Sequence, residues 1–395
     1  MSLRQSSRTR VLVLGGYGVF GGRLTQLIAE LPDLDIAVGG RRLAAAQRFC
    51  DSMTEHGDGT LLTPLELPDI AALRRHLDTT DTYILANCVG PYQGQDYAIA
   101  EAAIAAGAHY VDLADGREFV AGFARLDDAA QAAGVLMVTG ASTLPGLSAA
   151  VVDALRADMT EIESIETAIA PGMQMDRGDA VVRAILGYVG KPFEVWHNGA
   201  WQTAHGWQGL RSCRLTAGER DTGKRWLAAC DVPDLALFPE RYTGVQSVTF
   251  RAGLEIPWVH FGLWGLSWLV RAGLLPGLTP LTGVTRRMAA GLSALGTGRG
   301  GMYLDLTGRL PNGQRVTRRW TIIADSSEGP WIPVLPAFLV IEKLISRHIS
   351  ARGARACLDL FALSDFEALT QRFDMETQTT ETQTIEMQTA ETISG

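Results

Sequence analysis

The stretch Val11-Leu-Val-Leu-Gly-Gly-Tyr-Gly-Val-Phe-Gly21 decides the fold that this sequence predicts. It opens with a continuous apolar run, which is typical of a buried parallel strand. Gly16, Gly18 and Gly21 then have the spacing G-x-G-x-x-G, between that strand and the start of a predicted helix. In this context the glycines permit a tight turn, a close approach of pyrophosphate to the backbone, and close packing of helix on strand.

We therefore predict a dinucleotide-binding turn, because the N-terminus of the following helix offers oriented N–H groups and a partial positive charge to phosphate. The residues expected to contact the cofactor here are Gly16, Tyr17, Gly18, Val19, Phe20 and Gly21. The alternative is a glycine-rich turn of the same shape that binds nothing.

The surrounding sequence alternates strand and helix signals as far as residue 157. Strands are expected at 11–14, 36–38, 83–87, 110–113 and 135–139, and helices at 19–30, 43–52, 98–106 and 119–133. Such alternation is typical of βαβ units. We predict an α/β protein whose first domain, residues 1–157, is a Rossmann-type doubly wound parallel sheet that binds NADP.

The pattern changes beyond residue 157. Asn198-Gly199 and Asn312-Gly313 each separate two strand-like runs, which indicates β-hairpins, because Asn-Gly tolerates the positive φ of a type I′ turn. Residues 158–333 are therefore expected to form a mixed α/β domain with an antiparallel sheet, for substrate binding and dimerisation. Helices in 334–373 are expected to return to the first domain. The five-residue polar repeat of 374–395 is expected to be a disordered tail.

Composition and charge exclude several classes of protein. The 395 residues are 47% hydrophobic and carry a formal net charge of −8, so a basic field for nucleic acid is absent. The five cysteines form no C-x-x-C pair and the histidines lack metal-ligand spacing, so we predict no metal site and a reducing, cytoplasmic location. No signal peptide is expected at the N-terminus.

The choice of nicotinamide cofactor depends on the end of the second predicted strand. An NAD site usually has Asp or Glu there, to bind the ribose 2′-hydroxyl. This sequence has Arg41 and Arg42 instead, and two guanidinium groups suit a 2′-phosphate. We predict NADP(H). The alternative is that both arginines merely begin the next helix in solvent.

Gly15, Gly18 and Gly21 also fit G-x-x-G-x-x-G, the pattern of the extended short-chain dehydrogenases. Those enzymes typically use a Tyr-x-x-x-Lys pair, and no tyrosine here passes that test; Tyr188, for example, is followed four residues on by Pro192. An atypical member of that family without the pair is kept as an alternative.

Four segments of the first domain carry a resemblance to a known family: Gly15–Arg23, Asn87–Tyr92, Ala106–Leu113 and Gly140–Gly146. On these residues the chain resembles the saccharopine dehydrogenase-like family, closely over about 10–155 and loosely afterwards. The resemblance implies an NADP-binding Rossmann domain, a mixed α/β domain, and hydride transfer between NAD(P)(H) and a carbon–nitrogen bond. Many similar proteins look like general oxidoreductases without a settled substrate.

The candidate site residues lie on loops that follow predicted strands. Asn87, Gly90 and Pro91 are expected to line the nicotinamide side, at the point where the sheet order reverses. Tyr92, Asp115 and Ser142 are the candidate catalytic residues, since imine reduction needs a nearby proton donor. The lysine–histidine pair of the lysine-forming saccharopine enzymes has no convincing counterpart.

The segment 257–271 reads as an unusually apolar helix. Trp258, Phe261, Trp264 and Trp268 share one face, and leucines cover another. Three roles remain open: a core or dimer-interface helix, a lid over an apolar substrate, or a helix in a membrane interface.

Together these features predict an NADP(H)-dependent oxidoreductase that transfers hydride to or from a C=N or C=O substrate. The expected partners are a small-molecule substrate, a second copy in a homodimer, and a peripheral membrane contact through 257–271. The alternatives are a non-catalytic NADP(H)-binding sensor or scaffold, and an atypical extended short-chain reductase.

Overall fold

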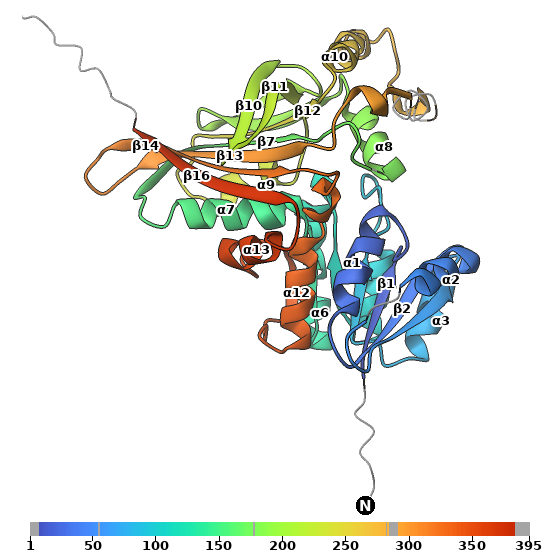
Figure 1. Cartoon of the computed structure of the whole chain (residues 1–395). Helices are drawn as coiled ribbons and strands as arrows, with labels where there is room; N and C mark the ends of the chain where they lie inside the picture. The colour runs from blue at the N-terminus through green and yellow to red at the C-terminus, as the bar shows by residue number, and fades with distance from the viewer. Residues whose placement is uncertain (1–7, 54–55, 177, 282, 284–290, 384–395) are drawn as a thin grey trace, which may run out of the picture.

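The computed structural model describes residues 8–53, 56–176, 178–281, 283 and 291–383, which build two sheets (Figure 1). Sheet A has seven parallel strands in the order β15-β6-β5-β4-β1-β2-β3. Their bounds are β1 (Thr9–Leu14), β2 (Leu34–Gly40), β3 (Leu61–Glu66), β4 (Ile84–Asn87), β5 (His109–Asp112), β6 (Leu136–Thr139) and β15 (Gly353–Ala356).

Helices cover both faces of sheet A, so its strands are apolar on both sides. One face packs against α1 (Val19–Ala29) and α12 (Leu335–Ile345), whereas α7 (Ser148–Leu155) packs against the second sheet. The other packs against α3 (Ile70–Asp78), α4 (Ala98–Ala105), α5 (Arg117–Ala121) and α6 (Asp127–Ala133). The strand order reverses between β1 and β4, and ligands of such sheets bind outside the carboxyl ends at this point. The predicted doubly wound Rossmann-type sheet is confirmed.

Sheet B is the mixed sheet of the second domain. Its main path is β10-β11-β12-β7-β13-β14-β16, with β8 and β9 attached as a hairpin to β12. Only the β7–β12 pair within the described residues is parallel in this sheet. The bounds are β7 (Glu161–Ala170), β8 (Pro192–His197), β9 (Ala200–His205), β10 (Arg211–Ala217), β11 (Arg220–Ala229), β12 (Ser247–Leu254), β13 (Gly300–Arg309), β14 (Arg315–Ala324) and β16 (Met375–Gln383).

The remaining elements connect or flank the two sheets. The helices are α2 (Leu43–Ser52), α8 (Gly178–Tyr188), α9 (Asp234–Arg241), α10 (Pro257–Arg271) and α13 (Leu363–Thr370). Short 3₁₀ or π turns are η1 (Gly122–Leu126), η2 (Thr143–Leu147), η3 (Thr279–Leu281), η4 (Ser293–Leu295) and η5 (Gly329–Trp331). Both predicted hairpins form; at the first, Asn198 and Gly199 have φ of 52° and 72°, as a type I′ turn requires.

One apolar core runs through both sheets. Buried residues of sheet A and its helices, such as Val11, Leu24 and Ile28, belong to the same cluster as Phe250, Met302 and Trp320 of sheet B. The chain also crosses back: after β14 it forms α12, which packs on α1, and then β15, which pairs with β6. The two sheets therefore share their packing.

The structure corrects the prediction of a disordered tail. Residues 375–383 form β16, which pairs with β14 along its whole length from Val316 to Ala324 (Figure 1). Because side chains alternate along a strand, a five-residue repeat puts Glu376 and Glu381 on opposite faces. Glu376 pairs with Arg220 at 3.2 Å and Glu381 with Arg318 at 2.8 Å. Pairing with β14 stabilises β16 as a strand, which its polar composition alone did not indicate. Residues 384–395 of the predicted tail lie outside the described part of the chain.

Candidate active site

The glycine turn has the shape that its spacing predicts. Gly15 has φ +79° and donates its N–H to the Gly39 carbonyl at 2.8 Å, which brings the end of β1 against β2. A Cβ at Gly21 would overlap the Gly15 carbonyl oxygen, and one at Gly16 would lie 2.8 Å from the Val13 carbonyl oxygen. Only glycines permit this close approach of α1 to the turn.

The N-terminus of α1 is open to an anion. Gly18 is its N-cap and supplies no side-chain cap, and the first turn holds no acidic residue. The N–H groups of Val19, Phe20 and Gly21 have no acceptor within the helix, because the first turn of any helix lacks them. The turn therefore fits a pyrophosphate by shape and by charge.

Arg41 and Arg42 lie at the carboxyl end of β2 and are exposed. Neither guanidinium makes a hydrogen bond or an ion pair with a described residue. Tyr17 reaches over from the glycine turn, and its hydroxyl accepts a hydrogen bond from the Arg42 backbone N–H at 3.1 Å. Its ring covers Gly40, where a Cβ would lie 2.5 Å from the phenol.

The loop after β4 is held by Asn87 and Tyr92. The Asn87 amide donates to the Tyr110 hydroxyl at 3.0 Å and accepts from the Val89 N–H at 3.1 Å. The Tyr92 hydroxyl donates to the Asn87 carbonyl at 2.7 Å, and burial raises the pKa of Tyr92 well above its usual value. Both side chains are buried and committed to the loop itself.

A cavity of about 290 Å³ lies between the carboxyl edge of sheet A and sheet B. Phe20 of α1 reaches it from the glycine turn, and Asp115 and Ser142 reach it from the loops after β5 and β6. Sheet B and its surroundings contribute a mostly apolar wall, which includes Ile169, Ile185, Cys230, Phe250, Met302 and Ile332. Tyr92 is not among the residues that line it.

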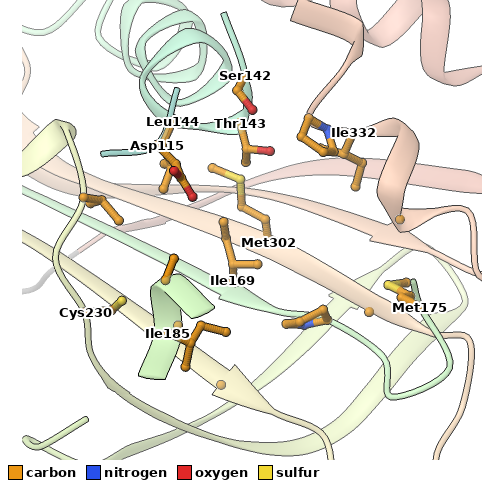
Figure 2. Close-up of a pocket in the computed structure, with 18 of the residues that line it drawn as sticks. Asp115, Ser142, Thr143, Leu144, Ile169, Met175, Ile185, Cys230, Met302 and Ile332 are labelled. Carbon is orange, nitrogen blue, oxygen red and sulfur yellow. The ribbon is translucent and has the colours of Figure 1, made fainter. Parts of the chain in front are cut away.

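The loops of the first domain supply polar groups to one wall of this cavity. Figure 2 shows Asp115, Ser142 and Thr143 together, opposite Ile185 and Cys230. The Asp115 carboxylate accepts a hydrogen bond from the Gln93 side chain at 3.1 Å, and burial raises its pKa. The Ser142 hydroxyl has no hydrogen-bond partner among the described residues, so it is available to a ligand.

Three cavity residues were not singled out from the sequence as catalytic candidates. Tyr188 at the end of α8 lies near Asp115; burial and then that carboxylate raise its pKa. Asp231 pairs with Arg117 at 3.0 Å. Burial raises the pKa of Cys230 to about 12, so its thiol stays protonated. All three come from the second domain, where no local motif marks a site, and only the fold brings them to Asp115.

The structure thus brings Asp115 and Ser142 together and leaves Tyr92 outside. No cluster of His, Cys, Asp or Glu suited to a metal occurs in the described parts of the chain. A search of the same parts finds no helix long and apolar enough to cross a membrane.

A reversing parallel sheet, a glycine turn before α1 and a cavity at the carboxyl edge define a dinucleotide-binding fold of the dehydrogenase type. Residues 11–142, about a third of the chain, match the family described as "Saccharopine dehydrogenase NADP binding domain". The resemblance stated from the sequence is therefore confirmed for this part of the chain. The match supports an oxidoreductase with a nicotinamide dinucleotide cofactor.

A comparison with solved structures extends the likeness to both domains. The saccharopine dehydrogenase (L-Glu forming) of Saccharomyces cerevisiae has 13% identity and a TM-score of 0.63, over 95% of this chain and 100% of that one. At this identity the likeness establishes the two-domain fold alone. No curated protein sequence matches the chain.

Two other structures overlap more loosely. A meso-DAP dehydrogenase variant from Clostridium tetani has 14% identity and a TM-score of 0.43, over 92% of this chain and 99% of that one. An amine dehydrogenase from Mycobacterium smegmatis has 11% identity and a TM-score of 0.42, over 90% and 96%. These overlaps are too loose to support an argument.

Proposed function

We propose that this chain is an NADP(H)-dependent oxidoreductase that reduces a C=O or C=N group on an apolar substrate, or oxidises the corresponding product. The observation that carries the proposal is the cavity, which joins the helix of the glycine turn to the Asp115 carboxyl and the Ser142 hydroxyl, within mostly apolar walls. A substrate seated there would lie between the cofactor side of sheet A and sheet B.

Arg41 and Arg42 support a preference for NADP(H) over NAD(H). Arg41 and Arg42 stand at the end of β2 without protein partners in the described residues, and a 2′-phosphate offers three anionic acceptors to such groups. Gly16, Gly18, Gly21 and the α1 N-terminus would hold the pyrophosphate. Gly90 and Pro91 stay predictions for the nicotinamide side.

The chemistry needs a proton as well as a hydride. When bound, NADPH supplies the hydride that goes to the carbonyl or imine carbon. Asp115 is the proton source for the oxygen or nitrogen, because its raised pKa keeps the carboxyl protonated to higher pH than in water. Ser142 would donate a hydrogen bond to the same atom and orient it. The apolar walls exclude water from the reacting group.

The preference for an apolar substrate follows from the charges at the cavity. Its lining includes three carboxyl residues, Asp115, Asp176 and Asp231, and no Lys or Arg is among the described residues that line it. A substrate with several carboxylates would be repelled here, whereas an alkyl or aryl ketone, aldehyde or imine would bury its carbon skeleton favourably.

The test has two stages. NADPH and NADH are titrated separately by fluorescence with wild type and the Arg41→Ala/Arg42→Ala double variant. The control is Arg48→Ala, an exposed arginine on α2, the helix that follows the pair. We expect tight NADPH and weak NADH binding, with NADPH affinity lost roughly 100-fold in the double variant only. Equal losses for both cofactors would overturn the NADP(H) assignment.

The second stage measures NADPH oxidation with alkyl ketones, aldehydes and imines beside amino-acid adducts. Turnover of the apolar set supports the proposal, and turnover of the adducts alone overturns the apolar preference. Tight NADPH binding without any turnover favours the alternative, a non-catalytic sensor or scaffold. A homodimer and a cytoplasmic location stay predictions.

A further inference from the structure

The helix α10 exposes an apolar face to solvent. Its outward face consists of residues at helical spacing that are all exposed: Trp258, Phe261, Gly262, Gly265, Trp268 and Leu269. Trp258 is 55% exposed and Trp268 46%. Every residue on this face is apolar or small, although it is the face that meets solvent. Figure 1 shows α10 at the top of the molecule, beside β11 and β12 and away from sheet A.

Two polar residues of α10, His260 and Ser267, face the protein. Both are fully buried, seven residues apart on the same side. The His260 ring packs on Trp207 at 5.1 Å, and burial lowers its pKa to about 4, so it stays neutral near neutral pH. Ser267 donates its hydroxyl to the Trp264 carbonyl at 2.6 Å. The orientation is therefore fixed by packing against Trp207, and the apolar side is left outside.

The sequence between Glu255 and Asp305, which includes α10, carries only positive charge. It has no acidic residue, in a chain whose net charge is −8; of the described arginines in this stretch, Arg299 pairs with Asp325 and Arg271 lies at the end of α10. Arg271 ends α10 with its guanidinium 5.1 Å from the Trp268 ring. Just beyond it, Leu274 is 71% exposed. The aromatic face is thus bordered by positive charge and by another exposed apolar side chain.

These features fit a lipid surface better than a protein partner. A helix of 15 residues is roughly 22 Å long and 10 Å wide, so one face of it covers roughly 220 Å². A stable protein interface buries ~800 Å² on each partner, which is far more than this face offers. Tryptophan is favoured at the boundary between headgroups and acyl chains, where it needs no shaped partner. Arginine beside it attracts anionic lipid.

We propose that the outward face of α10 docks the protein on an anionic bilayer, with the helix lying in the plane of the interface. The helix is too short to span, so the contact is peripheral. The proposal does not depend on the proposed function, because docking requires neither cofactor nor substrate.

Vesicle flotation of the full chain tests the proposal. Vesicles of phosphatidylcholine containing a quarter phosphatidylglycerol are compared with pure phosphatidylcholine, at low and high salt. We expect flotation with the anionic vesicles, weakened by salt, and a loss of roughly tenfold or more in the Trp258→Ser/Trp268→Ser variant. The matched control is Trp201→Ser on β9, a tryptophan that is 47% exposed and outside α10.

A second readout keeps the test independent of the variants. Phosphatidylcholine brominated in its acyl chains, mixed into the anionic vesicles, should quench the tryptophan fluorescence of the wild-type protein. Absence of both flotation and quenching would overturn the proposal. Flotation that survives in the double variant would also overturn it, because another surface would then be responsible. A dimer in sedimentation that the double variant abolishes, without flotation, would assign the face to a second copy.

Discussion

The hydroxyl of Tyr17 accepts a hydrogen bond from the backbone N–H of Arg42 at 3.1 Å, which ties the glycine turn to the start of α2. The pyrophosphate site and the proposed 2′-phosphate site are therefore mechanically linked. Removal of this hydroxyl should loosen the placement of Arg42 without removing a charge. We expect Tyr17→Phe to raise the NADPH dissociation constant about fivefold and to leave that of NADH nearly unchanged, since one neutral hydrogen bond is worth ~1 kcal/mol. An equal change for both cofactors would show that Tyr17 acts on the shared pyrophosphate side instead.

Substitutions of Asp115 and Tyr92 should have opposite effects on catalysis and stability, although the sequence made both of them candidate catalytic residues. Once a substrate is found, Asp115→Asn should lower kcat about 100-fold and flatten its pH profile, with NADPH binding unchanged. Tyr92→Phe should lower Tm but spare kcat, because its hydroxyl holds the Asn87 carbonyl in a buried loop. The comparison uses steady-state rates and thermal melts of both variants. A Tyr92→Phe protein that is folded but inactive would refute this division of roles.

The buried carboxyl of Asp234 predicts an unusual pH dependence of stability. The residue is 2% exposed on α9, and burial raises its pKa to about 7. In the unfolded chain it ionises near pH 4, whereas the folded state resists ionisation until about pH 7. Its contribution therefore favours the fold at low pH and is lost as the pH rises through this window.

Asp234→Asn should remove that loss. We expect the variant to gain roughly 2 kcal/mol relative to wild type between pH 5 and pH 8, as measured by denaturant melts at both values. The control is Asp128→Asn, an exposed carboxylate on α6. A gap between variant and wild type that is the same at both pH values would contradict the assignment of the shift to Asp234.

The strand β16 should matter for stability out of proportion to its polar composition. A chain that ends at Asp374 would leave the whole edge of β14 unpaired and would remove the Arg318–Glu381 ion pair. We expect Tm to fall by at least about 5 °C and aggregation to increase. Truncation after Gln383 is the control and should leave Tm unchanged. Similar melting of both truncated chains would mean that β16 adds little to the fold.

The sequence was most informative where one physical requirement is satisfied locally. The spacing of Gly16, Gly18 and Gly21 predicts the turn, because strand, turn and helix are adjacent in the chain. Asn198-Gly199 predicts its hairpin for the same reason. The cavity could not be predicted, since Asp115 and Tyr188 are far apart in sequence and meet only when sheet B packs on the carboxyl edge of sheet A. The strand β16 was missed because its partner, β14, determines its structure.

Tyr92 shows a different limit of sequence reasoning. A tyrosine after a strand at the reversal of the sheet has the right position for catalysis, but position does not say where the hydroxyl points. Here it turns back to the Asn87 carbonyl, and the Tyr110 hydroxyl and the Asp112 Oδ1 are likewise engaged in internal hydrogen bonds. A polar residue near a site must first be checked against the needs of its own loop.

The apolar core that runs from Val11 and Leu24 to Met302 and Trp320 has a consequence for how a ligand enters. Many two-domain enzymes open by rotation about a linker, which leaves each domain's interior intact. Here such a rotation would split a shared interior, and it would also have to drag β15 out of sheet A, because the chain passes from one sheet to the other repeatedly. We therefore expect no hinge motion between the two domains. Access of a ligand to the cavity should instead depend on small movements of surface elements such as α8.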